Sequence, residues 1–296
     1  MPQTGRRNAL KLLSGSFVVA SFPWQLASAN AQKAGNSAGD GTLALVFDGS
    51  MRTQVVFRGK ALTPFQASES LLTAKGPIDS FVYKGHVPTL VDDPKHGRAS
   101  RHSITGTSAN GIEKTVDLTF FEQFPGLAVL QVHYRNTGTT PLEITGWRNG
   151  AHELADTPGG FWSFSGATHE DRRDWIQPVK AGFEQRNTLR MAASDYGGGI
   201  PMANLWSRDV GLAVGHLEPL PRLLDLPVSR TAKGARLAIE STDAATLAPG
   251  TTLSTDRTFI VVHTGDHFAP LTQYRRFLEQ EGVAGPQAPE SAFAPV

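Results

Sequence analysis

The chain has 296 residues, of which 40% are hydrophobic, so it is long enough to bury a sizeable core. Its 28 basic and 27 acidic residues nearly cancel, which gives no electrostatic argument for binding nucleic acid or an anionic membrane surface. It contains no cysteine, which excludes disulfide bonds and thiolate metal sites and leaves side-chain packing as the source of stability.

The first 31 residues predict an export signal. Arg6 and Arg7 form a twin-arginine pattern, followed by an apolar run from Leu12 to Ala20 and then by small residues typical of a cleavage site. The apolar run is far shorter than the roughly 20 residues that a membrane-spanning helix requires. We therefore expect residues 1–31 to be a signal peptide of the twin-arginine type and the protein to be periplasmic or secreted, with no membrane association after cleavage.

The region from residue 42 to residue 264 has the pattern of an all-β domain. Residues 32–41 are small and polar and predict a flexible leader. Short apolar or alternating runs then recur between turn residues, with an Asn-Thr-Gly turn at 136–138. The runs are 43–47, 54–58, 80–83, 112–121, 127–135, 142–147, 210–216, 236–240 and 257–263. Many short strands with Gly and Pro between them predict packed antiparallel sheets.

One C-terminal helix is expected within residues 265–284. Leu271, Tyr274, Phe277 and Leu278 fall on one face at helical spacing, and Gly282 is placed to end the helix. Residues 285–296, rich in proline and alanine, predict a linker.

The segment from 195 to 209 has the composition of a sugar-binding loop. Its glycine run at 197–199 allows the backbone to approach a ligand closely, and its aromatic and charged residues can stack on a sugar ring or bond to hydroxyl groups. The candidates are Asp195, Tyr196, Gly198, Gly199, Trp206, Arg208 and Asp209. The alternative is that Tyr196 and Trp206 are ordinary core or interface aromatics and that Arg208 and Asp209 form an ordinary ion pair.

A second candidate patch lies between residues 162 and 175. It combines two tryptophans with interleaved charges, at Trp162, His169, Arg172, Arg173, Asp174 and Trp175. Of these we assign Trp162, Asp174 and Trp175 to sugar binding, since indole faces stack on pyranose rings and carboxylates accept hydrogen bonds from hydroxyl groups. The alternative is an exposed loop whose two tryptophans are buried in the core.

Three segments together resemble a known family: FWSFSGATHEDRRDWIQPVKAGF at 161–183, DYGGGIPMANLWSRDVGLAVGHLEPLPRLLDLPV at 195–228 and GDHFAPLTQYRRFLEQEGV at 265–283. They are similar to the region that precedes the catalytic barrel of melibiase-type alpha-galactosidases. The resemblance implies an antiparallel β-supersandwich, galactose-mutarotase-like, that binds carbohydrate of the α-galactoside class. It also implies that this domain lends loops to the active-site rim of a barrel that carries the catalytic aspartates.

We expect that barrel to be absent from this chain, so no catalytic residue is assigned. Truncation, gene splitting or a frameshift would account for its absence, and an apolar face near 201–206 and 271–278 would lie exposed for a separate barrel chain or for self-association. Two other functions stay open. One is a freestanding carbohydrate-binding module, and the other is a mutarotase-like aldose epimerase that uses His216 and Glu218 from one face of a strand.

No metal or cofactor is expected. The groupings His152 with Glu153 and His263 with His267 match no zinc-binding spacing, and the chain has no phosphate-binding or dinucleotide-binding glycine pattern.

Overall fold

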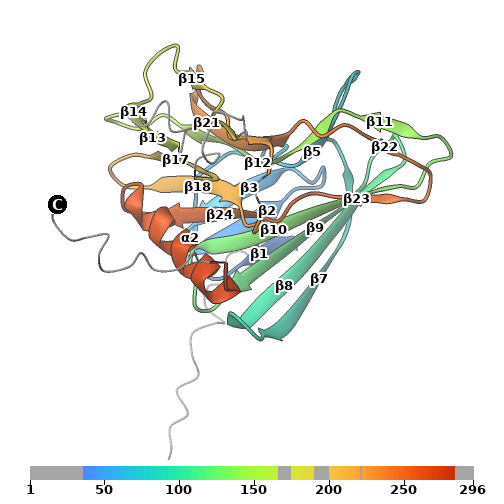
Figure 1. Ribbon diagram of the computed structural model, residues 1–296, viewed down its shortest axis with the longest axis horizontal. Coiled ribbons are helices and arrows are strands. Elements are labelled where there is room, and N and C mark those ends of the chain that lie inside the picture. The colour runs from blue at the N-terminus through green and yellow to red at the C-terminus, as the bar shows by residue number, and fades with distance from the viewer. Residues whose placement is uncertain (1–35, 166–174, 190–199, 221, 284–296) are drawn as a thin grey trace, which may run out of the picture.

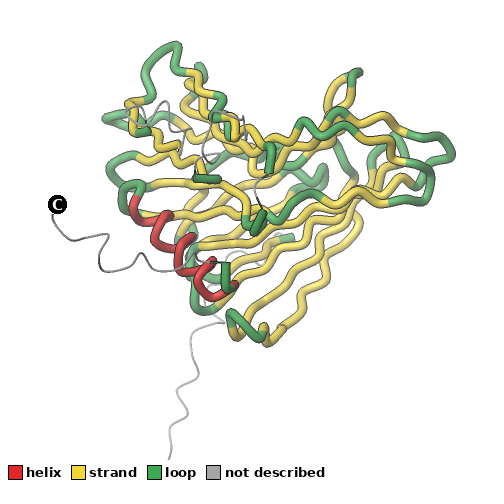
Figure 2. The backbone as a smooth tube through the Cα atoms, in the orientation of Figure 1, coloured by secondary structure: helices red, strands yellow, loops and turns green. Residues whose placement is uncertain are grey.

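The described residues of the computed structural model, 36–165, 175–189, 200–220 and 222–283, form antiparallel β-sheets and a C-terminal helix (Figures 1 and 2). This confirms the predicted all-β fold class. The expected signal peptide at 1–31 and the expected linker at 285–296 lie outside the described residues. Within the described residues, no helix is long and apolar enough to cross a membrane.

The largest sheet has ten strands, and its long strands β7 to β10 fan out across the molecule (Figure 1). In spatial order it contains β14 (Ile176–Pro178), β13 (Trp162–Ser165), β17 (Met202–Trp206), β18 (Gly211–His216), β24 (Thr258–His263), β10 (Leu127–Asn136), β9 (Ile112–Phe121), β8 (Gly97–Thr107) and β7 (Val82–Asp93), with β23 (Thr252–Ser254) beside β10.

The second sheet has eight strands and faces the first across the core. Its main path is β15 (Glu184–Gln185), β20 (Val228–Arg230), β21 (Gly234–Ser241), β12 (Gly146–Ala155), β5 (Ser70–Thr73) and β6 (Gly76–Ile78), with β16 (Thr188–Leu189) and β19 (Leu224–Asp225) off that path. Two smaller sheets complete the fold. They contain β1 (Ser37–Gly39), β2 (Leu43–Phe47), β3 (Thr53–Phe57) and β4 (Lys60–Ala61), and β11 (Leu142–Ile144) with β22 (Ala245–Leu247).

The strand β1 falls inside the segment expected to be a flexible leader. It pairs with β2, and Ala38 is buried against the core. The small side chains that suggest a leader also allow a short strand to pack closely, because Gly39 lies against Ala44 where a Cβ atom would clash.

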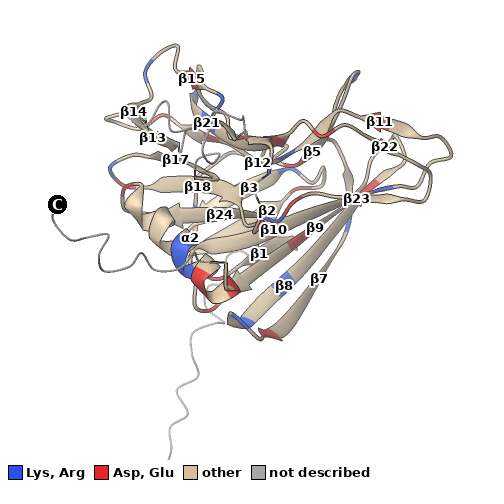
Figure 3. Ribbon diagram, in the orientation of Figure 1, with Lys and Arg blue, Asp and Glu red and all other residues tan. Residues whose placement is uncertain are grey.

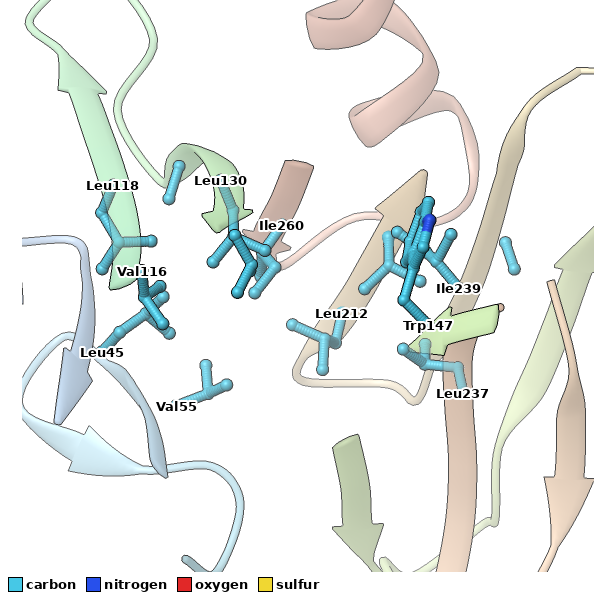
Figure 4. Packing of buried hydrophobic residues seen from close by; sticks show 14 of the residues in the cluster. Leu45, Val55, Val116, Leu118, Leu130, Trp147, Leu212, Leu237, Ile239 and Ile260 are labelled. Atoms are coloured by element: carbon cyan, nitrogen blue, oxygen red, sulfur yellow. The ribbon is translucent and has the colours of Figure 1, made fainter. Parts of the chain in front are cut away.

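The main hydrophobic core lies between the two large sheets. Alternate residues of each strand point into it, as the buried Val116 and Leu118 of β9 show. Leu212 of the ten-stranded sheet lies close to Leu237 and Ile239 of the eight-stranded sheet in this core (Figure 4).

The helix α2 (Phe268–Glu281) covers part of the other face of the ten-stranded sheet and forms a second core. Phe277 is buried there, and Leu271, Tyr274 and Leu278 pack around it, which confirms the predicted apolar face. Gly282 ends the helix in the left-handed conformation, as predicted. The expectation that the face near 201–206 and 271–278 lies exposed is wrong for the described chain, because the helix and the sheet bury each other.

One ion pair lies wholly inside the protein. Lys114 Nζ of β9 is 3.5 Å from Glu69 Oε2, just before β5, and both side chains are fully buried. The ammonium group also lies 4.8 Å from the centre of the Phe81 ring. Glu69 accepts further hydrogen bonds from the hydroxyl groups of Ser68 and Thr53. The pair therefore links the two large sheets through the core.

Three buried histidines are held in the neutral state. Burial lowers the pKa of His152 to about 3 and the pKa values of His216 and His263 to about 4. His152, on β12, points toward the core between the sheets, and neither of its ring nitrogens has a hydrogen-bond partner in the described structure.

The strand β7 is the edge of the ten-stranded sheet among the described strands (Figure 1). Val87 and Leu90 are 63% and 83% exposed, while Pro88 lies between them. The pairing of β7 with β8 shifts register between Tyr83 and Gly85, so Lys84 forms a bulge. In Figure 3, basic and acidic positions are interspersed over the strands and the helix.

Candidate functional site

The outward face of the ten-stranded sheet carries a row of side chains that crosses four strands. Trp162 of β13 lies opposite Trp206 of β17, which lies opposite Gly211 of β18, which lies opposite His263 of β24. Directly opposite residues of antiparallel strands project to the same face of a sheet, so these side chains share one surface. Trp162 is 45% exposed and His263 is buried. The row therefore runs from an accessible indole to a buried imidazole.

The position of the His263 ring depends on Gly211. A Cβ atom on residue 211 would lie 2.2 Å from His263 Cε1, so glycine leaves the space that the imidazole occupies. Reaching over β18, His263 Nε2 donates to Asn204 Oδ1 at 3.0 Å. Because the lowered pKa keeps the ring neutral at neutral pH, this hydrogen bond determines which ring nitrogen carries the proton.

We expect Gly211→Ala to lower the free energy of unfolding by about 1–3 kcal/mol, because the added methyl group must displace the His263 ring. Urea unfolding measures the change. Gly85→Ala is the matched control, since a Cβ atom on that strand glycine meets nothing within 4 Å. Equal stabilities of the two variants would contradict the role of Gly211.

A cluster of aromatic rings surrounds Phe164, two residues after Trp162 on β13. Its ring stacks on His267 with centroids 5.2 Å apart, and meets the Trp175 ring edge-on at 6.1 Å. His267 in turn lies 5.6 Å from the Trp206 ring and 4.2 Å from the Phe268 ring. The start of α2 and the strands β13 and β17 therefore build one aromatic surface.

This surface combines exposed apolar groups with two ring nitrogens that are buried beneath it. Phe268 and Ile176 are 65% and 43% exposed beside the exposed Trp162. The nitrogens Trp175 Nε1 and His267 Nδ1 have no hydrogen-bond partner among the described residues. Exposed aromatic faces with polar groups beside them suit a sugar, which has apolar ring faces and hydroxyl edges.

The structure brings together the three predicted tryptophans, and it shows which of them is exposed. Trp206 and Trp175 are partly buried, whereas Trp162 is exposed. The interpretation with both Trp162 and Trp175 in the core is therefore wrong for Trp162. Trp162 is exposed because cross-strand pairing places it at the accessible end of the row.

Arg208 and Asp209 lie in the tight turn between β17 and β18. Both are exposed, and the turn is closed by a hydrogen bond of 2.8 Å from the Ser207 amide to the Val210 carbonyl. In the described structure the two side chains form no ion pair with each other, contrary to the simple alternative. Their place just beyond Trp206 keeps them near the aromatic row.

Several predicted residues lie outside the described residues, namely Asp195, Tyr196, Gly198 and Gly199 of the first candidate loop and His169, Arg172, Arg173 and Asp174 of the second. The described strands show where these segments join the sheet. Ser165, the last residue of β13, pairs with Ala203 near the start of β17, so both segments attach at the same end of neighbouring strands.

The arrangement expected for a mutarotase-like site is not formed. The strand β18 ends at His216, so Glu218 is not on the same strand face. His216 Nδ1 accepts a hydrogen bond from the Glu218 amide, and Glu218 Oε1 accepts one from the Arg257 amide at 2.7 Å. Through these hydrogen bonds both residues stabilise the connection that follows β18.

The histidine groupings considered for a metal do not form a ligand cluster within the described residues. His152 points into the core, whereas the neighbouring Glu153 accepts a hydrogen bond from Thr231 Oγ1 at 2.7 Å. Across the described residues, no group of three or more potential ligands is placed to hold a metal ion.

The chain is similar in sequence or fold to several enzymes that act on carbohydrates. No protein-family model matches the chain. A curated relative, the A type blood alpha-D-galactosamine galactosaminidase of Flavonifractor plautii, is 23% identical over 203 residues, which are 67% of this chain and 19% of that protein.

Solved structures show the likeness more fully. An alpha-galactosidase from Lactobacillus brevis superposes with a TM-score of 0.62 and 13% identity over 82% of this chain and 41% of that one. This is the fold of part of an alpha-galactosidase. The GH36 alpha-galactosidase AgaB from Geobacillus stearothermophilus matches with a TM-score of 0.54 and 16% identity, over 77% of this chain and 39% of its own. A variant of AgaA from the same organism, solved in complex with raffinose, matches with a TM-score of 0.51 and 15% identity, again over 77% of this chain and 40% of its own.

The resemblance inferred from the sequence is thus confirmed at the level of the fold. The chain spans about two fifths of the length of these alpha-galactosidase structures and about one fifth of the galactosaminidase.

Sequence reasoning missed several members of the site in the alpha-galactosidase-like fold. Phe164 and Phe268 lie within the segments that carry the resemblance. Their position close to Trp162 and His267 in the sequence is the signal that could have identified them. Asn204 gave no signal, because it sits inside the apolar run of β17 and becomes a hydrogen-bond partner only through pairing across β18.

Proposed function

We propose that this chain is the non-catalytic β-sandwich domain of an alpha-galactosidase-like glycoside hydrolase and that its aromatic surface contacts the carbohydrate. The observation that carries the proposal is the row from Trp162 to His263, an exposed indole next to ordered polar groups, in a fold shared with part of the GH36 alpha-galactosidases. The likeness to a raffinose-bound alpha-galactosidase supports α-galactosides as the ligand class.

In this proposal the catalytic carboxyl groups come from a separate barrel. Glycoside hydrolysis usually uses two carboxyl groups that face each other across the scissile bond. The described residues form sheets and one helix, without the alternating strands and helices of a (β/α)₈ barrel. The domain would then contribute the segments 166–174 and 190–199 to the rim of that barrel's active site.

The proposal predicts that the chain binds raffinose but does not hydrolyse p-nitrophenyl α-galactoside. Raffinose should shift the indole NMR signal of Trp162, and Trp162→Ala should weaken binding by about tenfold, or about 1.4 kcal/mol. Phe65→Ala is the control, because Phe65 is 37% exposed at a site far along the chain from the aromatic surface.

Two results would contradict the proposal. Unchanged raffinose binding in Trp162→Ala would show that the aromatic row is not part of the binding site. Hydrolysis by the purified chain, abolished by one Asp or Glu substitution, would show that the chain carries its own catalytic groups.

A further inference from the structure

A pocket lies on the outer face of the eight-stranded sheet, away from the aromatic surface. Its volume is about 240 Å³, and residues of β12, β15, β20 and β21 line it. Along β21 the core-facing Leu237 and Ile239 alternate with Arg236 and Glu240, which point outward into the pocket. The pocket therefore belongs to the polar face of this sheet.

Most charged groups of the pocket already have partners. Arg148 of β12 holds Glu240, with its Nε and Nη2 atoms both 2.7 Å from Glu240 Oε1. Arg186 Nε lies 2.5 Å from Oδ2 of the buried Asp225. These pairs fix the walls of the pocket on two sides.

Arg236 is different, because it is half-buried and forms no ion pair within the described structure. Burial and the nearby Arg148 guanidinium lower its pKa, while Glu240 and Glu153 favour its charge from beyond ion-pair distance. A guanidinium group that is partly shielded from water gains from further hydrogen-bond acceptors, and its planar fork matches a carboxylate. The empty space in front of Arg236 is the place for that acceptor.

We propose that this pocket binds a small sugar acid, such as a hexuronic acid, with its carboxylate on Arg236. The other lining groups suit the hydroxyl groups of the same molecule. Glu240 accepts hydrogen bonds, and Ser229, which lies opposite Arg236 on β20, both donates and accepts. The volume suits one small ring rather than a long oligosaccharide. This inference goes beyond the proposed function and does not depend on it, since it concerns the other sheet.

The test is calorimetric titration of the full chain with D-galacturonate, with D-galactose and acetate as comparison ligands. We expect D-galacturonate to bind, D-galactose to bind at least tenfold more weakly, and acetate to bind more weakly than D-galacturonate because it lacks hydroxyl groups. Added salt should weaken D-galacturonate binding, since the contact is between charges. Equal affinity for D-galactose and D-galacturonate would overturn the proposal, as would a failure of D-galacturonate to bind.

Variants locate the contact. Arg236→Gln should weaken D-galacturonate binding by about tenfold or more, as expected for a lost charged hydrogen bond. It should keep its circular dichroism spectrum, because Arg236 supports no ion pair. Arg98→Gln is the matched control, since it removes one exposed arginine from the other sheet.

Glu184→Gln separates the proposal from its main competitor, in which Glu184 turns to neutralise Arg236. Under the proposal both the unaltered chain and this variant bind D-galacturonate, the variant at least as tightly because a repulsive charge is gone, whereas under the competitor only the variant binds. Unchanged binding in Arg236→Gln would overturn the assignment, and so would loss of binding in Glu184→Gln. Raffinose binding at the aromatic surface should be the same in all three variants, which keeps the two sites distinguishable.

Discussion

Lys114→Met should lower the free energy of unfolding by about 3–5 kcal/mol, the largest effect we expect from a single substitution. Lys114 and Glu69 are both fully buried and lie 3.5 Å apart. Burial lowers the pKa of Lys114, and the neighbouring Glu69 carboxylate opposes that change. Removing the ammonium group leaves Glu69 charged in the core without its counter-ion.

A double variant distinguishes this reason from a simple packing defect. Glu69→Gln removes the charge and keeps an oxygen that can accept the hydrogen bond from Ser68. In the combination Lys114→Met with Glu69→Gln, much of the lost stability should return, because no unpaired charge remains. Urea unfolding followed by circular dichroism measures all three variants. A loss in the double variant as large as the sum of the two single losses would contradict the coupling.

Acid should destabilise the fold through its buried histidines. His152, His216 and His263 have pKa values lowered to about 3 or 4, below the ordinary value near 6.5 that each regains on unfolding. The unfolded chain therefore binds protons first as the pH falls. The stabilising effect of the neutral rings is complete above pH 6.5 and is lost progressively between about pH 6.5 and pH 4, continuing to about pH 3 for His152. Each histidine contributes a slope of at most about 1.4 kcal/mol per pH unit.

The variant His152→Leu isolates one of these contributions. Its free energy of unfolding should depend less steeply on pH between 6.5 and 4, by the equivalent of about one proton. At pH 7 it should be as stable as the original protein or more so, because both ring nitrogens of His152 are buried without partners. Denaturant unfolding over a series of pH values measures this. An unchanged pH dependence would show that His152 is not a source of acid sensitivity.

The parts of the fold that could be predicted are those with a local signal. The apolar alternation of β9 and β10 identified those strands, and the apolar face of α2 identified the helix. Most of β7 and β8 was missed, because an edge strand in water needs no apolar alternation and β8 beside it carries many polar residues.

Long-range partners could not be predicted. The apolar alternation around residue 114 predicts that this position lies in the core. A buried lysine is unexpected there, and only the folded structure shows that Glu69 lies beside it as its ion-pair partner. In the same way, Trp162 and Trp206 were both proposed for sugar binding from composition alone. Their pairing depends on the strand register, which a single sequence does not reveal.

The form of the β7 edge bears on how the protein avoids association during folding. Among the described strands, the outer edge of β7 beside the exposed Val87 and Leu90 has no neighbouring strand, and such an edge is a template on which another molecule's strand could extend the sheet. Pro88 has no amide hydrogen to offer such a strand, and the bulge at Lys84 breaks the register a few residues earlier. An incoming strand would therefore find only short, interrupted stretches to pair with, so the edge resists intermolecular sheet extension while its apolar side chains stay in water.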